Sequence, residues 1–327
     1  MPCKSCLVLE LQFDILLKNP KNISMIPILV NHFQRRNLTI KVEGNQLIIY
    51  ESGVRELLDF SRHFMDRENL SFRFEDNEWK PIKEIENILD MQWIDEVIRR
   101  KAVVSYSQPI VNVNEDIYAY EVLSRFTRED GTLIYPNEVF TAAKSRGRLY
   151  ALDRLCRMAA VSYSAILKKK TFINFIPTSI YSPEFCLQST IKLANTLGIA
   201  PTQFVFEVVE SERVDDIEHL KSILNYYKEK GFQYALDDVG QGYSTLEMLK
   251  DIQPHYMKLD IHYVQGVSND HQKQKVAQLF LEKALEVNAT PLAEGIESRE
   301  DFEWLKQCGY QLFQGYLFGK PSIVPQR

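Results

Sequence analysis

Two adjacent carboxylates, Asp237 and Asp238, end a short apolar run and are followed by Gly240 and Gly242. Neighbouring residues on a regular strand point to opposite faces, so both acids serve one site only where the strand gives way to a loop. Like charges a few ångströms apart raise each other's pKa unless a cation lies between them. The pair therefore indicates either a metal-bridging site or a solvated turn whose aspartates cap the next helix.

Polar side chains also interrupt the other apolar runs of this part of the chain. In chain order they are Glu121 and Arg125, Asn174, Glu207, Lys258 and Asp260, Glu294, and Gln314. Each alone could belong to a structural ion pair, because charged side chains are rarely buried without a partner. Together they offer carboxylate and carboxamide oxygens without cysteine or histidine, which favours Mg²⁺ or Mn²⁺ over zinc. The oxygens suffice for two ions, the usual arrangement for in-line attack on a phosphodiester.

The elements that must position these side chains begin near residue 102. Two strand patterns, 103–111 and 117–126, are separated by a segment too short for a parallel crossover, which predicts an antiparallel hairpin. Helical and strand patterns then alternate to the end of the chain. The sequence therefore predicts an α/β fold, a TIM-type (β/α)8 barrel with an antiparallel first strand. Active sites of such barrels lie at the C-terminal strand ends.

The region before the barrel has a different pattern. Residues 1–78 show strand and helix patterns in the order β-α-β-β-α-β, which is typical of a small ferredoxin-like α+β domain. It contains no catalytic constellation, so a regulatory or dimerising role is expected. Residues 79–101 predict a long amphipathic linker helix, and residues 102–327 the barrel domain.

Composition limits the classes of partner. The chain has 327 residues, 44 acidic and 39 basic, for a formal net charge of −5. This balance offers no electrostatic footprint for duplex nucleic acid or an anionic membrane. No apolar run approaches the ~18 residues of a membrane span. Five scattered cysteines predict reduced thiols and a cytoplasmic protein. Cys3 and Cys6 are either incidental or have a redox or metal role that requires dimerisation.

Several segments, taken in order, resemble the signature segments of EAL domains, bacterial phosphodiesterases that hydrolyse cyclic di-GMP. They are Glu121-Val-Leu-Ser-Arg125, Asn174, Phe206-Glu-Val-Val-Glu-Ser211, Asp237-Asp-Val-Gly-Gln-Gly-Tyr-Ser-Thr-Leu246, Lys258-Leu-Asp260, Ala293-Glu-Gly-Ile-Glu297 and Gln314-Gly-Tyr316. The resemblance covers about residues 100–322 and leaves the N-terminal region outside. It departs at Val122, where the family has alanine, at 239–241, and after Asn174.

The resemblance implies metal ligands and catalytic residues. Ligands of the first ion would be Glu121, Asn174, Glu207 and Asp237; Asp237 would bridge to a second ion held with Asp238 and Glu294. Lys258 would position or deprotonate the attacking water, although it could instead pair with Asp260 on the same strand face. Glu297 would hold the loop that follows the aspartates. Substrate-binding candidates are Arg125, a forked donor suited to phosphate, Gln108, Gln314 and Asp260.

The expected function is hydrolysis of cyclic di-GMP to linear pGpG by water activated at two metal ions. The family resemblance also implies a homodimer. A second hypothesis is a catalytically silent cyclic di-GMP receptor that signals through the N-terminal domain. A third is an unrelated metal-dependent barrel enzyme, because a fold alone fixes no chemistry.

Overall fold

The computed structural model describes residues 9–74, 78–209, 217–239 and 246–324, without the side chains of 209, 217, 238–239 and 246–248. Cys3 and Cys6 lie outside this part. The chain divides into two compact units, one containing residues 101–136 and 152–327 and the other residues 2–100 and 137–151. The domain boundaries at residues 78 and 101 remain predictions. Among the described helices, none combines the length and apolarity needed to cross a bilayer.

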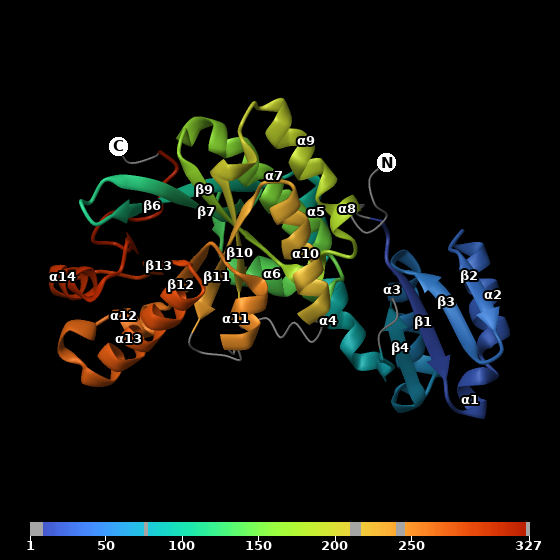
Figure 1. Ribbon diagram of the computed structural model, residues 1–327. Coiled ribbons are helices and arrows are strands. Elements are labelled where there is room, and N and C mark those ends of the chain that lie inside the picture. The colour runs from blue at the N-terminus through green and yellow to red at the C-terminus, as the bar shows by residue number, and fades with distance from the viewer. Residues whose placement is uncertain (1–8, 75–77, 210–216, 240–245, 325–327) are drawn as a thin grey trace. The chain divides into compact units, whose positions relative to one another are not determined.

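Eight strands of the larger unit close into a barrel (Figure 1). They are β6 (Val103–Asn112), β7 (Ile117–Thr127), β9 (Lys170–Phe175), β10 (Phe204–Val209), β11 (Gln233–Val239), β12 (Tyr256–Leu259), β13 (Thr290–Ala293) and β14 (Leu312–Gln314), with β8 (Leu133–Ile134) added beside β7. β6 runs antiparallel to β7 and β14, and neighbours from β7 through β9 to β14 are parallel. The predicted TIM-type barrel with a reversed first strand is therefore confirmed.

A layer of mainly apolar side chains fills the interior of the barrel, and each strand contributes one residue to it. The layer consists of Ile110, Ala119, Phe172, Val205, Ala235, Tyr256, Leu292 and Leu312. Strand residues of the opposite parity, such as Phe206 and Phe313, lie in the outer core with the helices. The barrel is thus a packed body and not a pore.

Helices cover the outside of the barrel (Figure 1). They are α7 (Leu149–Leu167), α8 (Pro183–Cys186), α9 (Gln188–Thr196), α10 (Ile217–Glu229), α11 (Leu246–Ile252), α12 (Ile261–Val264), α13 (His271–Glu286) and α14 (Arg299–Cys308). Short 3₁₀ turns lie at η4 (Pro177–Ser179), η5 (Pro201–Gln203) and η6 (Val267–Asn269).

The smaller unit is an α+β structure, as predicted. Its elements are β1 (Gln12–Leu17), α1 (Pro20–Ile23), α2 (Ile26–Arg35), β2 (Ile40–Glu43), β3 (Gln46–Tyr50), α3 (Glu51–Phe64), η2 (Arg67–Asn69), β4 (Leu70–Phe74), β5 (Lys80–Pro81), η3 (Ile82–Glu84), α4 (Ile85–Asp90) and α5 (Trp93–Arg99), with α6 (Pro136–Ser145) from the later segment. The sheet order is β2-β3-β1-β4-β5, and every neighbouring pair is antiparallel. This agrees with the split β-α-β-β-α-β pattern.

The segment predicted as one linker helix forms two short helices instead. α4 and α5 are separated at Met91 and Gln92, where the Met91 N–H bonds back to the Ile88 carbonyl and the Gln92 N–H to the Leu89 carbonyl. Ile85, Ile88 and Leu89 pack in the core of the smaller unit. Burial of these residues holds α4 in that core, so the segment turns instead of continuing as a straight helix.

A cluster of four buried charges lies in the smaller unit. The Arg146 guanidinium, 0% exposed, donates to Glu51 Oε1 at 3.0 Å and Oε2 at 2.8 Å, and to Asp95 Oδ2 at 2.5 Å. Arg148 Nε donates to Asp95 Oδ1 at 2.8 Å. Buried charges require such partners. The cluster ties residues 146–148 to the elements of the N-terminal region.

Candidate active site

The predicted site residues form the next layer of the barrel interior. Each lies two residues from a member of the apolar layer, and side chains two apart on a strand share a face. The new layer is Gln108, Glu121, Asn174, Glu207, Asp237, Lys258, Glu294 and Gln314, seven of them within their strands and Glu294 directly after β13. Gln108 precedes its apolar neighbour Ile110 because β6 runs in reverse; the others follow theirs. The barrel geometry therefore gathers eight polar side chains at one end.

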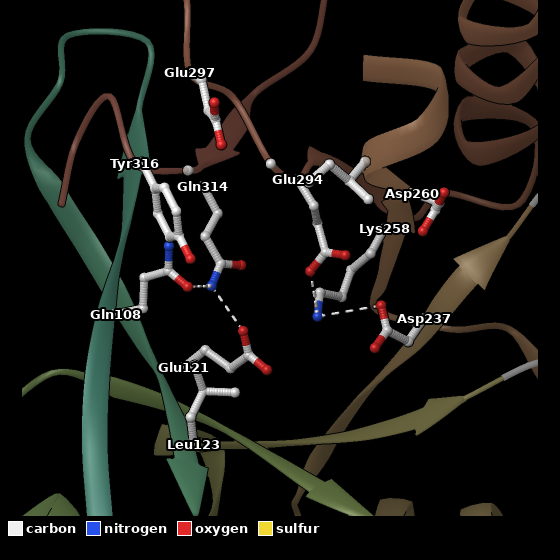
Figure 2. A pocket seen from close by; sticks show the side chains of 13 residues that line it. Gln108, Glu121, Leu123, Asp237, Lys258, Asp260, Glu294, Glu297, Gln314 and Tyr316 are labelled. Atoms are coloured by element: carbon white, nitrogen blue, oxygen red, sulfur yellow. Dashed lines mark hydrogen bonds and ion pairs between the residues drawn. The ribbon is translucent and has the colours of Figure 1, made fainter. Parts of the chain in front are cut away.

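A pocket of about 390 Å³ opens over this layer (Figure 2). It is lined by Gln108, Glu121, Leu123, Asp237, Lys258, Asp260, Ile261, Glu294, Gly295, Glu297, Gln314, Gly315 and Tyr316. Asn174 and Glu207 do not line the pocket, although both contact residues that do.

Lys258 lies at the centre of a carboxylate cluster. Its Nζ is 2.6 Å from Glu207 Oε1, 3.2 Å from Asp237 Oδ1 and 2.5 Å from Glu294 Oε1. Figure 2 shows two of these contacts converging on the ammonium from either side. The side chains of Lys258 and Glu207 are 1% and 0% exposed, so these interactions are shielded from solvent.

Glu121 is held by amides on the other side of the pocket. Asn174 Nδ2 donates to Glu121 Oε1 at 2.9 Å, and Gln314 Nε2 donates to Glu121 Oε2 at 2.7 Å. Gln314 Nε2 also donates to Gln108 Oε1 at 3.2 Å, and Gln108 Nε2 to the Gly319 carbonyl at 3.2 Å. Each oxygen of the Glu121 carboxylate is therefore fixed by one amide donor (Figure 2 shows the contact with Gln314).

Burial and charge shift the pKa values of these groups in opposite directions. Burial raises the pKa of Glu207 and of Glu294 well above the ordinary range, and the negative charge of Asp237 adds to both. Burial also acts to raise the pKa of Glu121, but the Lys258 charge and the hydrogen bonds from Gln314 and Asn174 outweigh it and lower that pKa. Burial acts to lower the pKa of Lys258, yet the surrounding carboxylates raise it well above its usual value.

The donor chemistry of the site fits a hard divalent cation. Glu207 Oε2 and Gln314 Oε1, both buried, accept no hydrogen bond from the described residues, whereas Glu207 Oε1 contacts Lys258 Nζ at 2.6 Å. Buried oxygens without donors are natural ligands for Mg²⁺ or Mn²⁺. No three acidic, histidine or cysteine side chains in the described part of the chain are spaced to hold an ion as they stand. The Lys258 ammonium occupies the centre of the acidic cluster.

Two glycines permit the backbone approaches around the pocket. A Cβ on Gly315 would lie 2.0 Å from the Ile296 carbonyl oxygen, so only glycine fits after Gln314. Gly295 follows Glu294 with φ +69°, and a Cβ there would lie 2.1 Å from Ile261 Cγ1.

Three predicted site residues lie apart from the central layer. Arg125 is not among the pocket-lining residues; it donates to the Ser124 carbonyl at 2.9 Å, and its guanidinium carbon lies 5.4 Å from the Tyr106 ring centroid. Glu297 lies exposed at the pocket margin. Asp260 caps α12, accepting from His262 N at 2.9 Å and Nδ1 at 2.6 Å.

The remaining predicted site residue, Asp238, is in β11. Its side chain lies outside the described residues, as does the loop of residues 240–245 that Glu297 is predicted to hold. The register between β11 and β12 shifts between Leu236 and Val239. The strand is thus irregular at the acidic pair, but it continues to Val239 instead of giving way to a loop at the two aspartates.

Sequence reasoning gave no role to Leu123 and Tyr316, which also line the pocket. Both lie two residues beyond a predicted site residue, Glu121 and Gln314. The strand period of two could have identified Leu123, which lies in β7, but not Tyr316, which follows the end of β14.

Comparison with known proteins shows a family match over most of the chain. Residues 91–321 match the family model described as the EAL domain. The chain is 32% identical over 238 residues to the probable cyclic di-GMP phosphodiesterase PdeG of Escherichia coli K12, covering 69% of this chain and 47% of that protein. It is 26% identical to the cyclic di-GMP phosphodiesterase PdeF of the same organism, covering 66% of this chain and 29% of PdeF.

A solved structure is similar in both sequence and fold. It is the standalone versatile EAL protein from Vibrio cholerae O395 in its c-di-GMP-bound form, with 36% identity and a TM-score of 0.60 over 67% of this chain and 92% of that chain. The present chain spans about half or less of the two curated relatives above.

Proposed function

Because this chain belongs to the EAL domain family, we propose that it hydrolyses cyclic di-GMP to linear pGpG with two divalent ions, Mg²⁺ or Mn²⁺. The observation that carries the proposal is the polar layer, in which Glu121, Asp237, Lys258 and Glu294 line one pocket and the Glu207 carboxylate contacts Lys258 beneath it. The names of the E. coli relatives, and the cyclic di-GMP bound to the V. cholerae protein, support the choice of substrate.

The residues that would hold the first ion are Glu121, Asn174, Glu207 and Asp237, and those for the second are Asp237, Asp238 and Glu294. When bound, the ions would supply a nucleophilic water and offset the charge that develops on the phosphate. Asn174 and Gln314 keep the Glu121 carboxylate in a single orientation, so this ligand needs little rearrangement.

The remaining residues act on water and substrate. Lys258 would orient the attacking water and hold or release its proton, and Glu297 would hold the adjoining loop. Water adds across one P–O bond: its oxygen joins phosphorus, and the ribose 3′ oxygen leaves with a proton as the free hydroxyl of pGpG. Arg125 would contact a substrate phosphate. Gln108, Gln314 and Asp260 would contact the nucleotide from the pocket wall.

The test is direct. The purified full chain, stripped of metal and then given Mg²⁺ or Mn²⁺, should convert cyclic di-GMP to pGpG, resolved by chromatography. Lys258→Ala, which removes the amine at the centre of the site, should lower kcat at least about 100-fold. Absence of turnover in the wild-type chain, under conditions where an active relative works, would overturn the proposal.

A second candidate is a silent cyclic di-GMP receptor that signals through the N-terminal unit. The observation that favours it is the ammonium of Lys258 between the carboxylates, with no described trio of acids spaced for a metal. Tight cyclic di-GMP binding without cleavage at any Mn²⁺ concentration would establish it. A homodimer and a cytoplasmic location belong to the leading proposal, and light scattering of the purified chain would test the dimer.

A further inference from the structure

At its C-terminal end, β9 is paired with β10 but no longer with β7. The pairing of β9 with β7 ends at Ile173, while its pairing with β10 continues to Phe175. Asn174 lies at the point where the β7 ladder has ended, and its side chain reaches Glu121 across that gap at 2.9 Å. The peptide units around Asn174 therefore need support from outside the sheet.

Asp153 on α7 supplies that support. Its Oδ1 accepts a hydrogen bond from the backbone N–H of Ile176 at 3.0 Å. Ile176 follows β9 directly and lies two residues after Asn174. Asp153 is 3% exposed, so water competes little for the contact. The carboxylate thus fixes the backbone that carries Asn174.

Arg157 supplies the opposite charge for this buried carboxylate. It lies one turn along α7, is 2% exposed, and places Nη2 3.4 Å from Asp153 Oδ2. A buried carboxylate without a counter-charge would be protonated or displaced. The ion pair offsets the cost of burying the Asp153 carboxylate, and a hydrogen bond from Ile176 N–H to a paired carboxylate is charge-assisted.

An aromatic side chain supports the two neighbouring strands from the same side. The Tyr227 ring of α10 stacks on Phe206 of β10, with centroids 4.1 Å apart and an interplanar angle of 23°. It also meets Phe175 of β9 edge-on at 5.5 Å. Phe175 and Phe206 alternate along their strands with Asn174 and Glu207. The outer contacts therefore set the register of two inward-facing oxygen donors.

We propose that Asp153 is a positioning residue for the metal site, holding Asn174, and through it Glu121, from the outer side of the barrel. Arg157 pairs with the Asp153 carboxylate, and Tyr227 holds β9 and β10 against each other. This inference rests on the proposed metal-dependent function but concerns ion affinity. Removal of outer-shell partners typically weakens metal affinity about 10- to 100-fold.

The experiment is a Mn²⁺ titration of the metal-free full chain by calorimetry, without nucleotide. Asp153→Ala should raise the Mn²⁺ Kd about tenfold or more. Asp153→Asn keeps an oxygen for Ile176 N–H but loses the charge, so its Kd should rise about three- to tenfold. In steady-state assays, the lowered activity of Asp153→Ala should recover at high Mn²⁺, with the KM for cyclic di-GMP unchanged.

The matched control is Tyr310→Phe, which removes a buried hydroxyl that donates to the Ala277 carbonyl at 2.8 Å. It should lower Tm yet leave the Mn²⁺ Kd at the wild-type value, separating ion positioning from general stability. If Asp153→Ala folds and binds Mn²⁺ with the wild-type Kd, the inference is overturned. If the alanine variant does not fold, a wild-type Kd in Asp153→Asn overturns it instead.

The titration also separates the inference from the proposed function. A wild-type chain that binds Mn²⁺ but cleaves nothing would remove the enzyme proposal, and the Asp153 variants would still decide the inference. A wild-type chain that binds no Mn²⁺ would overturn both.

Discussion

The Lys258 ammonium is the positive charge around which the acidic side chains of the site gather. Three carboxylates lie within 3.2 Å of its Nζ, and two of them, Glu207 and Glu294, have a raised pKa because burial disfavours their charged forms. A divalent ion entering this cluster would compete with both the ammonium and protons. Metal binding should therefore depend on the charge of Lys258.

Lys258→Met tests this dependence, because methionine keeps much of the volume and removes the charge. Without metal, the variant should lose about 3–5 kcal/mol of unfolding free energy, because buried carboxylates remain without their counter-charge. Saturating Mn²⁺ should raise its Tm more than it raises the wild-type Tm. Scanning calorimetry with and without Mn²⁺ measures both. An equal Mn²⁺ effect on the two proteins would show that the ammonium and the ion do not compete.

Strand parity made most of the candidate site predictable from sequence. Polar residues inside apolar strand patterns indicate Glu121, Glu207, Lys258 and Glu294 from the sequence alone. The contacts could not be read from the pattern: parity does not show that Lys258 meets three acids on other strands. Those pairings depend on how far each strand extends along the barrel.

At the scale of elements, the turn after β14 depends on the glycine at 315. Gly315→Ala would place a methyl group against the Ile296 backbone and displace the segment that carries Gln314. Overpacking of this kind costs about 1–3 kcal/mol. The variant should also lower the activity, because Gln314 would no longer hold Glu121. Chemical denaturation and the hydrolysis assay measure the two effects.

Gly266→Ala offers a comparison, since it also replaces a glycine of the barrel unit but meets no atom within 4 Å. It should lose stability through its positive φ of 78° alone and keep its activity. Equal activity losses in the two variants would contradict the role of the turn.

The Asp301 carboxylate at the start of α14 predicts that the free energy of unfolding depends on pH. Burial acts to raise the pKa of Asp301, but hydrogen bonds from Ser268 N, Gly266 N and Ser298 outweigh burial and lower it below its ordinary value of 3.8. A lowered folded pKa gives stability that is present above 3.8 and lost as pH falls through the folded value. Asp301→Asn should thus cost about 1.5–3 kcal/mol at neutral pH and progressively less in acid.

Urea unfolding at neutral pH and near pH 3 measures that difference for wild type and variant. If the difference in unfolding free energy between wild type and Asp301→Asn stays constant across the pH range, altered hydrogen bonding, and not the carboxylate charge, causes the loss of stability.

Elements were predictable where periodicity was long and unambiguous. The 112–116 connection predicted the hairpin of β6 and β7, and Asn112 Oδ1 closes it by accepting from Asn114 N and Asp116 N. The interruption between α4 and α5 was not predictable, because apolar spacing continues across it. Packing of α4 in another core decides the break, and local pattern carries no information on that packing.

At the scale of the whole molecule, the buried charge cluster around Arg146 predicts that residues 137–151 unfold cooperatively with the N-terminal elements. Glu51→Ala would leave Arg146 with Asp95 and the Ile88 carbonyl and remove its bidentate partner. The smaller unit should lose about 3–5 kcal/mol. Hydrogen exchange should accelerate in residues 137–151 as well as in α3, although the two segments are far apart in sequence.

Glu56→Ala on the same helix serves as the matched control, because its partners His32 and Arg36 are solvent-accessible. It should change stability by less than about 1 kcal/mol and leave exchange in residues 137–151 unaltered. Unchanged exchange of that segment in Glu51→Ala would show that the cluster does not stabilise it.

The division of the chain has a practical corollary for anyone who recombines such proteins. A unit built from two separate segments of the chain cannot be exchanged between proteins at a single crossover. A chimera that joins this N-terminal region to a foreign barrel at a single crossover would leave Glu51 and Asp95 without their partners Arg146 and Arg148. Successful exchange requires two crossovers, so that residues 137–151 travel with their partners.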